Sequence, residues 1–295
     1  MPELPEVEAL AQFLDGRASG VAVAGVDVGA ISALKTFAPA PTDLVGRPVT
    51  RVVRRGKWLD VATGPDDDPL HLVFHLARAG WLRWYDTLPK TAVRPGRSPI
   101  ALRVRFGDGS GFDLTEAGTR KRLAVHVVTD PQQIEAVATL GVEPLSPEFT
   151  LERFAAMLAA RNKQIKGLLR DQSTIAGIGN AYSDEILHAA RTSPFALTRS
   201  FDPVATAVLH GAILRVLQEA VAAAAGKPAA ELKDSKRRGM RVHGRTGLPC
   251  PGWDGVPCGD TVHEVSFADS SLQYCPTCQT GGQPLADRRL SKLLR

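Results

Sequence analysis

The character of the sequence changes near residue 133, and this change constrains the fold most. Before it, runs such as "PVTRVVRRGKWLDVATG" and "HLVFHLARAGWLRWYD" are rich in β-branched and aromatic residues and are separated by Gly, Asp and Pro. "GDGSG" between two further runs predicts a hairpin. After residue 133 the segments are helical. Strands followed by helices favour an α+β protein whose N-terminal part is a β-sandwich.

Three helices are predicted in the second half of the chain. They are "LERFAAMLAARNKQIKGLLRD", "NAYSDEILHAAR" and "DPVATAVLHGAILRVLQEAVAAAAG", the last with Gly226 as its C-cap. "LGVEPLSPEFT" carries two prolines and is typical of a linker. We therefore expect a β-sandwich domain over 1–132, a linker over 133–148, a helical domain over 149–239, a cysteine-bearing module over 240–282 and a basic amphipathic tail over 283–295.

The chain opens with "MPELPEVEAL", which has the pattern of a helix with an unusual start. Apolar residues from Val7 to Leu14 recur at helical spacing, and proline is favoured at a first helical position, so Pro5 is predicted to begin the helix. Pro2 and Glu3 would then lie just ahead of a helix N-terminus.

The sequence predicts neither export nor membrane insertion. No apolar run is long enough to cross a bilayer, and the N-terminus has no basic stretch followed by an apolar one, so we expect no signal peptide. We expect a cytoplasmic monomer, associated with the nucleoid if its source is bacterial. Lys and Arg number 36 against 31 Asp and Glu, an excess too small to identify an anionic partner by itself.

All four cysteines lie near the C-terminus with the spacing C-x7-C-x16-C-x2-C, as Cys250, Cys258, Cys275 and Cys278. Four thiolates suit one tetrahedral Zn²⁺ ion. The alternative is two disulfides or unrelated thiols, which a reducing compartment disfavours. The cysteines therefore predict one structural zinc, although the first spacer is long.

Two further stretches each allow two interpretations. "KDSKRRGMRVHGR" is a solvated basic loop or, because it leads into the cysteines, a nucleic-acid surface. "IAGIGNAYSDEI" is a plain corner between helices or a phosphate-binding turn. In that stretch Gly177 and Gly179 permit a tight turn and Asn180 caps the next helix.

Taken together, "PELPEVE", "RRGKWL", "GIGNAYSDEIL" and the cysteine module resemble the formamidopyrimidine-DNA glycosylase and endonuclease VIII family, from the first residue to about Gln279. The resemblance implies a β-sandwich lobe and a lobe with a helix-two-turn-helix element and a zinc finger. It also implies a bifunctional enzyme that excises an oxidised base from double-stranded DNA and then cuts the strand by elimination at the abasic site.

The resemblance also assigns roles to residues. Pro2 would be the nucleophile, Glu3 the proton-transferring carboxylate and Lys57 a catalytic, phosphate-binding cation, with Glu6 supporting the site. A free secondary amine at Pro2 can attack the sugar and form a Schiff base. By itself, Met-Pro at a chain start indicates only that Met1 is readily removed; a retained Met1 would block the chemistry.

The implied DNA contacts lie mostly in the second half. Lys166 and Asn180 would hold the DNA backbone beside the lesion, and Arg245 belongs to the basic run before the cysteines. In the first half, Arg78 of "HLARAG" replaces the family's intercalating methionine, and Arg120 lies in "LTEAGTRKRLAV", which has no aromatic residue.

Two more departures concern binding. Ser270 stands where the family's zinc finger carries a phosphate-gripping arginine, and "GKPAAELKDSKRRGM" is short for the loop that closes over 8-oxoguanine in some relatives. Specificity for 8-oxoguanine is therefore not inferred. The missing zinc-finger arginine and the altered intercalating residues favour the alternative of a catalytically weak relative that binds damaged or abasic DNA, whereas intact Pro2, Glu3 and Lys57 oppose it.

Overall fold

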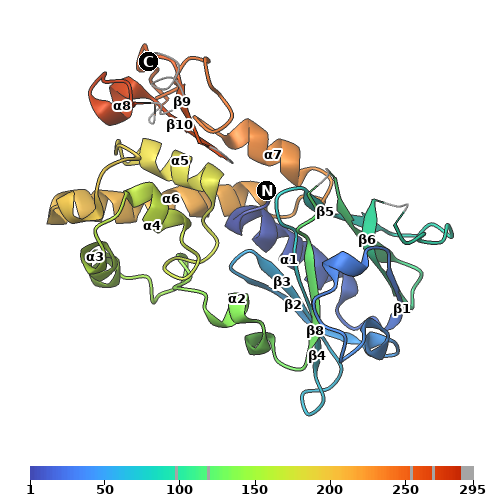
Figure 1. Ribbon diagram of the computed structural model, residues 1–295. Coiled ribbons are helices and arrows are strands. Elements are labelled where there is room, and N and C mark those ends of the chain that lie inside the picture. The colour runs from blue at the N-terminus through green and yellow to red at the C-terminus, as the bar shows by residue number, and fades with distance from the viewer. Residues whose placement is uncertain (97–98, 118–119, 253–254, 268–269, 287–295) are drawn as a thin grey trace. The chain divides into compact units, whose positions relative to one another are not determined.

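The computed structural model describes residues 1–96, 99–117, 120–252, 255–267 and 270–286 (Figure 1). These residues form two compact units. The first unit comprises residues 1–139 together with 224–233, and the second comprises the described parts of 140–223 and 234–295. Most of the predicted tail, residues 287–295, lies outside the described residues.

The first unit is a β-sandwich with an N-terminal helix, which confirms the predicted α+β class. Neighbouring strands are antiparallel in both four-stranded sheets. One sheet has the order β1 (Val23–Val28), β6 (Ile100–Phe106), β7 (Gly111–Glu116) and β5 (Gly80–Tyr85). The other has the order β2 (Val49–Arg55), β3 (Trp58–Thr63), β4 (Leu70–His75) and β8 (Ala124–Val128). The predicted "GDGSG" hairpin is present, because β6 and β7 pair directly across it.

One continuous apolar core holds both sheets and the first helix together. Leu14 from the helix, Phe74 from one sheet and Phe112 and Leu114 from the other are at most 1% exposed. Strand alternation explains the pattern, because every second side chain of a strand points to the same face.

The N-terminal helix α1 (Leu4–Ala18) begins one residue earlier than predicted. Glu3 is the N-cap, so Pro5 occupies the second helical position rather than the first. Proline is tolerated there because the backbone N–H groups of the first helical turn have no partner within the helix.

Short helices connect the larger elements of this unit. They are η1 (Ile31–Ala33), η2 (Pro41–Leu44), η3 (Pro131–Gln133) and α2 (Glu135–Ala138), and the last is within the segment predicted as a linker. Residues 224–233 also belong here. Ala229 and Leu232 are buried in the sandwich core, and the Ala229 carbonyl accepts a hydrogen bond from the Trp81 indole at 3.2 Å.

The second unit contains the predicted helices, but the first of them is two helices rather than one. They are α3 (Leu151–Ala160) and α4 (Ile165–Arg170), followed by α5 (Asn180–Ala189), η4 (Thr198–Ser200) and α6 (Pro203–Ala224). The break follows from tertiary hydrogen bonds. The Lys163 carbonyl accepts from the Thr198 N–H at 2.9 Å, and the Ile165 N–H donates to the Ala196 carbonyl at 2.8 Å. These bonds replace bonds that a continuous helix would make.

Helix α6 requires a correction to the expectation that no segment could cross a bilayer. By length and composition alone, its 22 residues with a mean hydropathy of 1.3 are sufficient, although a single such helix is weak evidence. Its side chains at Leu209, Ile213 and Leu217 are 0% exposed, which is the pattern of a packed amphipathic helix.

The cysteine-bearing segment follows α7 (Leu232–Gly239). It contains an antiparallel hairpin of β9 (His263–Ser266) and β10 (Ser271–Tyr274), and then the short helix α8 (Pro276–Thr280). Tyr274 is 1% exposed, and its hydroxyl accepts a hydrogen bond from the Leu285 N–H at 2.7 Å, which ties the chain after α8 back to the hairpin.

Candidate active site and metal centre

The N-terminal tip of the chain is fixed by buried carboxylates. Pro2 is buried, and the Glu3 and Glu6 side chains are each 2% exposed. The Glu3 backbone N–H donates to Glu6 Oε2 at 2.9 Å, and the first helical turn begins with the Glu3 carbonyl accepting from Val7. Met1, which precedes the buried Pro2, is 47% exposed.

Lys57 lies at the end of the β2–β3 hairpin. Arg55 pairs with Trp58, so Gly56 and Lys57 form a two-residue loop. Gly56 adopts a φ of 56°, a left-handed conformation that favours glycine and explains "RGK" at this turn. The Lys57 side chain is only 8% exposed, so its charge acts in a partly desolvated setting.

A chain of contacts joins this hairpin to the first helix. Arg54 donates to the Glu8 carboxylate at 2.8 Å and to the Gly56 carbonyl at 3.2 Å. Further along the helix, Asp15 accepts from the Val52 N–H at 2.7 Å. The structure therefore brings the N-terminal helix and the loop carrying Lys57 together. Sequence reasoning missed Glu8 and Arg54, whose pairing over 46 residues has no local signal.

His75 is a second residue that the sequence analysis missed. Burial, and second the positive charge of Lys57, lower the pKa of His75 to about 4. Its Nδ1 accepts from the Ala77 N–H at 3.1 Å, so the neutral ring carries its proton on Nε2. The imidazole is 5.0 Å from the Trp58 ring. A neutral histidine therefore lies near Lys57.

Arg78 follows β4 on a tight turn and is exposed. The preceding Ala77 has a φ of 50°, a left-handed conformation that is unfavourable for alanine. The Gly80 N–H donates to the Leu76 carbonyl at 2.9 Å and closes the turn. Arg120 is also exposed. Both arginines are thus placed where a binding partner could reach them.

In the second unit, Lys166 is part of a buried polar network. Lys166 is 6% exposed, and its ammonium group donates to Asp184 at 2.5 Å, to the Ser183 hydroxyl at 2.7 Å and to the Asn180 carbonyl at 3.2 Å. The other oxygen of Asp184 lies 2.8 Å from His243 Nδ1. The structure thus places Lys166 within the protein's own hydrogen-bond network.

Glu185, next to Asp184, holds the segment that leads to the cysteines. Its carboxylate accepts from three consecutive backbone N–H groups, those of residues 241–243, at 2.8–2.9 Å. Burial raises the pKa of Glu185, and these three bonds oppose that shift. The motif "SDEIL" therefore fixes the entry to the cysteine module, a role that the sequence analysis did not predict.

Asn180 does not cap α5 as predicted, because Gly179 is the N-cap. The Asn180 amide instead donates to the Ser271 carbonyl of β10 at 2.8 Å. Gly177 has a φ of 87°, so one of the two predicted glycines is needed for the left-handed turn. Arg245 is half-buried, and its Nε has no hydrogen-bond partner among the described residues.

The four cysteine sulfurs lie within 4.8 Å of one another, and among the described residues they are the group suited to a metal. Cys250 and Cys278 are 3.9 Å apart and Cys258 and Cys275 are 3.5 Å apart, far beyond a disulfide bond of about 2.05 Å. Tetrahedral Zn–S bonds of about 2.3 Å place sulfurs about 3.8 Å apart. The cluster therefore fits a structural zinc ion.

Cys250 lies away from water and beside a histidine of α5. Burial raises the pKa of the Cys250 thiol to about 12, so the thiol would keep its proton unless a metal displaced it. The side chain of His188, on α5, is 1% exposed, and its Nε2 lies 3.2 Å from Cys250 Sγ. Burial, and then the positive charges of Arg241 and Arg191, lower the pKa of His188 to about 4.

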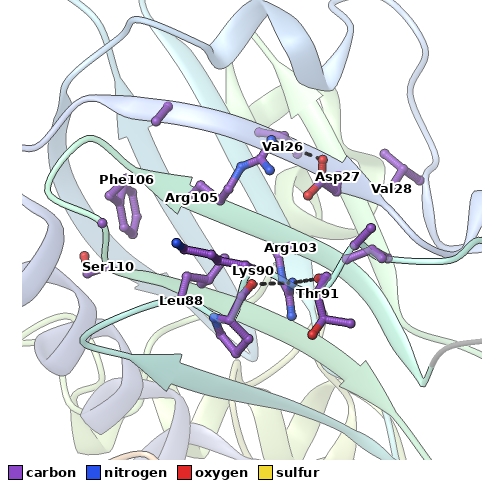
Figure 2. Close-up of a pocket in the computed structure, with 15 residues that line it drawn as sticks. Val26, Asp27, Val28, Leu88, Lys90, Thr91, Arg103, Arg105, Phe106 and Ser110 are labelled. Carbon is purple, nitrogen blue, oxygen red and sulfur yellow. Dashed lines mark hydrogen bonds and ion pairs between the residues drawn. The ribbon is translucent and has the colours of Figure 1, made fainter.

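A pocket of about 730 Å³ is lined by residues of β1 and β6 and by residues 88–93 (Figure 2). The two arginines that line it are paired with carboxylates of the protein itself. Arg103 forms a two-pronged ion pair with Asp113 at 2.7 and 2.8 Å and donates to the Thr91 carbonyl, while Arg105 contacts Asp27 at 3.3 Å. None of the predicted site residues lines this pocket, so it is not the candidate active site.

Comparison with known proteins agrees with these motifs. Residues 1–125 match the formamidopyrimidine-DNA glycosylase N-terminal domain, and residues 140–230 match the formamidopyrimidine-DNA glycosylase H2TH domain. The formamidopyrimidine-DNA glycosylase of Symbiobacterium thermophilum is 35% identical over 98% of this chain and 93% of its own length. The chain belongs to the formamidopyrimidine-DNA glycosylase family.

Other relatives in the glycosylase family sharpen the comparison. An uncharacterized formamidopyrimidine-DNA glycosylase-like protein of Mycobacterium tuberculosis is 54% identical over 53% of this chain and 94% of its own length. The structure of the Lactococcus lactis enzyme with DNA containing an abasic site has a TM-score of 0.80 at 26% identity, covering 94% of this chain and 99% of that one. MutM with DNA containing carbocyclic 8-oxo-G has a TM-score of 0.80 at 27% identity, covering 95% and 100%.

Proposed function

We propose that this chain is a base-excision repair glycosylase with an associated lyase activity on abasic sites in double-stranded DNA. The observation that carries the proposal is the N-terminal tip, where Pro2 directly precedes the N-cap of α1 beside two buried carboxylates. The family membership and the DNA-bound relatives support the same substrate class.

The chemistry requires removal of Met1, which frees the secondary amine of Pro2. The amine attacks C1′ of the damaged nucleotide, the bond from C1′ to the base breaks, and the base leaves with a proton. C1′ then carries both the Pro2 nitrogen and the ring oxygen O4′; the C1′–O4′ bond breaks, O4′ takes a proton, and an iminium group forms at C1′. The iminium acidifies the C2′ proton, and loss of that proton expels the 3′ phosphate and cuts the strand. The positive end of α1 favours the neutral form of the amine.

Buried acids and a cation would assist these steps. Glu3 donates a proton as the sugar ring opens and accepts one during elimination. Glu6 holds the Glu3 backbone in place through the 2.9 Å bond. Lys57, positioned by the tight hairpin, would bind a phosphate and favour the departure of charged groups.

Access to C1′ requires that the damaged nucleotide leaves the base stack. Arg78 on its exposed turn would fill the resulting gap, since a guanidinium can stack on bases and bond to the orphaned partner base. Arg120 would contact the DNA from a second exposed loop. Asn180, Lys166 and Arg245 would hold the DNA backbone; for Lys166 this requires exchanging its bond to Asp184 for one to a phosphate.

The cysteine cluster would hold one structural zinc ion, which stabilises the hairpin of β9 and β10. Ser270 replaces the expected arginine near this hairpin, and its carbonyl accepts from the Phe267 N–H at 2.7 Å. A serine offers no positive charge to a phosphate, so this module should bind DNA more weakly than one that carries the arginine. This difference supports a second candidate function, which is binding of damaged DNA with little catalysis.

Borohydride reduction on an abasic duplex tests the proposal. We expect the protein to form a covalent adduct and to cut the strand, and we expect Pro2→Gly to lose both by at least about a hundredfold while still binding DNA. A Pro2→Gly variant as active as the parent would contradict the assignment of the nucleophile. Tight binding by the parent without an adduct would favour the second candidate function.

A further inference from the structure

His188 on helix α5 contacts one of the four cysteines, and it has no role in the proposed DNA binding or catalysis. His188 is 1% exposed, and its Nε2 lies 3.2 Å from Cys250 Sγ, within the range of an N–H···S hydrogen bond. Cys250 itself is 0% exposed, so water does not solvate its sulfur.

We propose that His188 is a positioning residue of the metal centre, whose Nε2–H donates a hydrogen bond to the metal-bound thiolate of Cys250. This inference rests on the proposed zinc site. A metal-bound thiolate carries no proton and can only accept, so the proton in this contact must come from the imidazole.

The charge of the centre explains why such a donor is needed. Four thiolates around Zn²⁺ leave a net charge of about −2 in a largely buried setting, and buried charge is costly unless hydrogen bonds compensate it. The buried Nε2–H of His188, 3.2 Å from Cys250 Sγ, supplies one such bond. Outer contacts of this kind typically change metal affinity by about tenfold to a hundredfold.

The same helix also holds the chain just before the cysteines. Glu185 binds the backbone of residues 241–243, and His188, three residues later on the same helical face, contacts Cys250. Helix α5 is therefore attached to the metal module at two points, and its first residue, Asn180, bonds to Ser271 at a third. Through these three attachments, the position of the turn at Gly177 and Gly179, which precedes α5, depends on the cysteine module being folded.

The test uses the full chain with three substitutions. His188→Phe keeps a ring of similar size and removes the donor, whereas His188→Gln keeps an N–H group. His210→Phe is the matched control, because His210 is a partly buried histidine on α6 whose Nε2 lies 2.9 Å from the Phe149 carbonyl and which does not contact the cysteines. Circular dichroism verifies that each variant is folded.

Two measurements report on the metal site and do not depend on catalysis: the absorption spectrum of the cobalt-substituted protein and the rate of zinc release. With Co²⁺ replacing zinc, a thiolate that loses its hydrogen bond donates electrons more readily, so the thiolate-to-cobalt charge-transfer band of His188→Phe should move to lower energy. Zinc release to a chromogenic chelator should accelerate about tenfold or more. His188→Gln should restore both readouts at least in part, and His210→Phe should resemble the parent.

Each outcome separates this inference from the zinc proposal. A parent protein that binds neither zinc nor cobalt overturns both. A parent that binds cobalt through four thiolates, but whose band and zinc release are unchanged in His188→Phe, overturns only the role of His188. A parent cobalt spectrum of three thiolates and one nitrogen would show that His188 is a ligand, which also overturns it.

Discussion

Two lysines with similar burial show how differently the two units use a desolvated charge. Lys57 of the N-terminal unit is 8% exposed at the end of a two-residue hairpin loop, near a neutral His75. Lys166 of the second unit is 6% exposed and donates to Asp184, Ser183 and the Asn180 carbonyl. Burial alone therefore does not identify a catalytic lysine, and the groups around it are more informative.

The same contrast extends to the acids nearby. Glu6 fixes one backbone N–H at the N-terminal tip, where the proposed chemistry occurs. Glu185 fixes three backbone N–H groups and thereby holds the approach to the cysteines. In the first unit, Glu6 holds the backbone next to the proposed nucleophile, whereas in the second unit Glu185 holds the backbone that leads to the cysteines.

The largest expected effect is a difference between the two lysines in how their substitution changes stability and strand cleavage. Lys166→Met should destabilise the protein by about 3 kcal/mol, because the buried Asp184 loses the cation that pairs with it, although its contact with His243 remains. Lys57→Met should lose strand cleavage and retain most of the stability. Urea unfolding and single-turnover cleavage measure both. Adding Asp184→Asn to Lys166→Met should restore part of the stability; equal stability losses for the two single variants would contradict the comparison.

The second prediction concerns lesion recognition by the N-terminal unit. Arg78→Ala should reduce excision from a lesion-containing duplex by about tenfold to a hundredfold, because the gap left by the flipped base is no longer filled. Cleavage of a ready-made abasic site should change much less. Single-turnover rates with each of the four opposite bases provide the measurement, with Arg120→Ala as the matched arginine control. Equal losses on both substrates would show that Arg78 is only a phosphate contact.

The third prediction tests the proximity of Lys57 and His75. The folded state holds the pKa of His75 at about 4, below its ordinary value of 6.5, so the unfolded chain binds more protons between these values. Stability from this residue is thus complete above about pH 6.5 and is lost as the pH falls towards 4. At pH 5 the loss is about 2 kcal/mol.

Urea unfolding at pH 7 and pH 5 provides the measurement. His75→Phe should remove this part of the pH dependence. Lys57→Met should reduce it, because the charge of Lys57 is the second cause of the low pKa. An unchanged pH dependence in both variants would place the titrating groups elsewhere.

The smallest expected effect concerns the turn before Arg78. Ala77 has a φ of 50°, which glycine adopts without strain, so Ala77→Gly should stabilise the protein by about 0.5–1 kcal/mol. Thermal unfolding monitors the change. Excision should remain close to that of the parent if the turn only presents Arg78, and a lower melting temperature would contradict the assigned conformation.

The sequence predicted the features that local patterns encode. Alternation of apolar residues placed the strands, and the motifs around Pro2, Asn180 and the cysteines identified the family. The break between α3 and α4 was missed because its cause, the Thr198 and Ala196 hydrogen bonds, lies more than 30 residues further along the chain. Helical propensity cannot register such a partner.

The supporting residues of the site were missed for the same reason. Arg54 and Glu8 are separated by 46 residues, and His188 and Cys250 by 62. In the sequence, His188 resembles an ordinary residue on the packed face of a helix. The residues with roles in the proposed chemistry could be named from motifs, but the residues that hold them required the three-dimensional structure.

The central claim is that the N-terminal amine of Pro2 is the nucleophile, and peptide mapping of the borohydride-trapped complex tests it most directly. Mass spectrometry of the digested adduct should find the reduced sugar fragment on the N-terminal peptide, on a chain that begins at Pro2 and lacks Met1. An adduct on a lysine such as Lys57, or on a peptide that still carries Met1, would contradict the account.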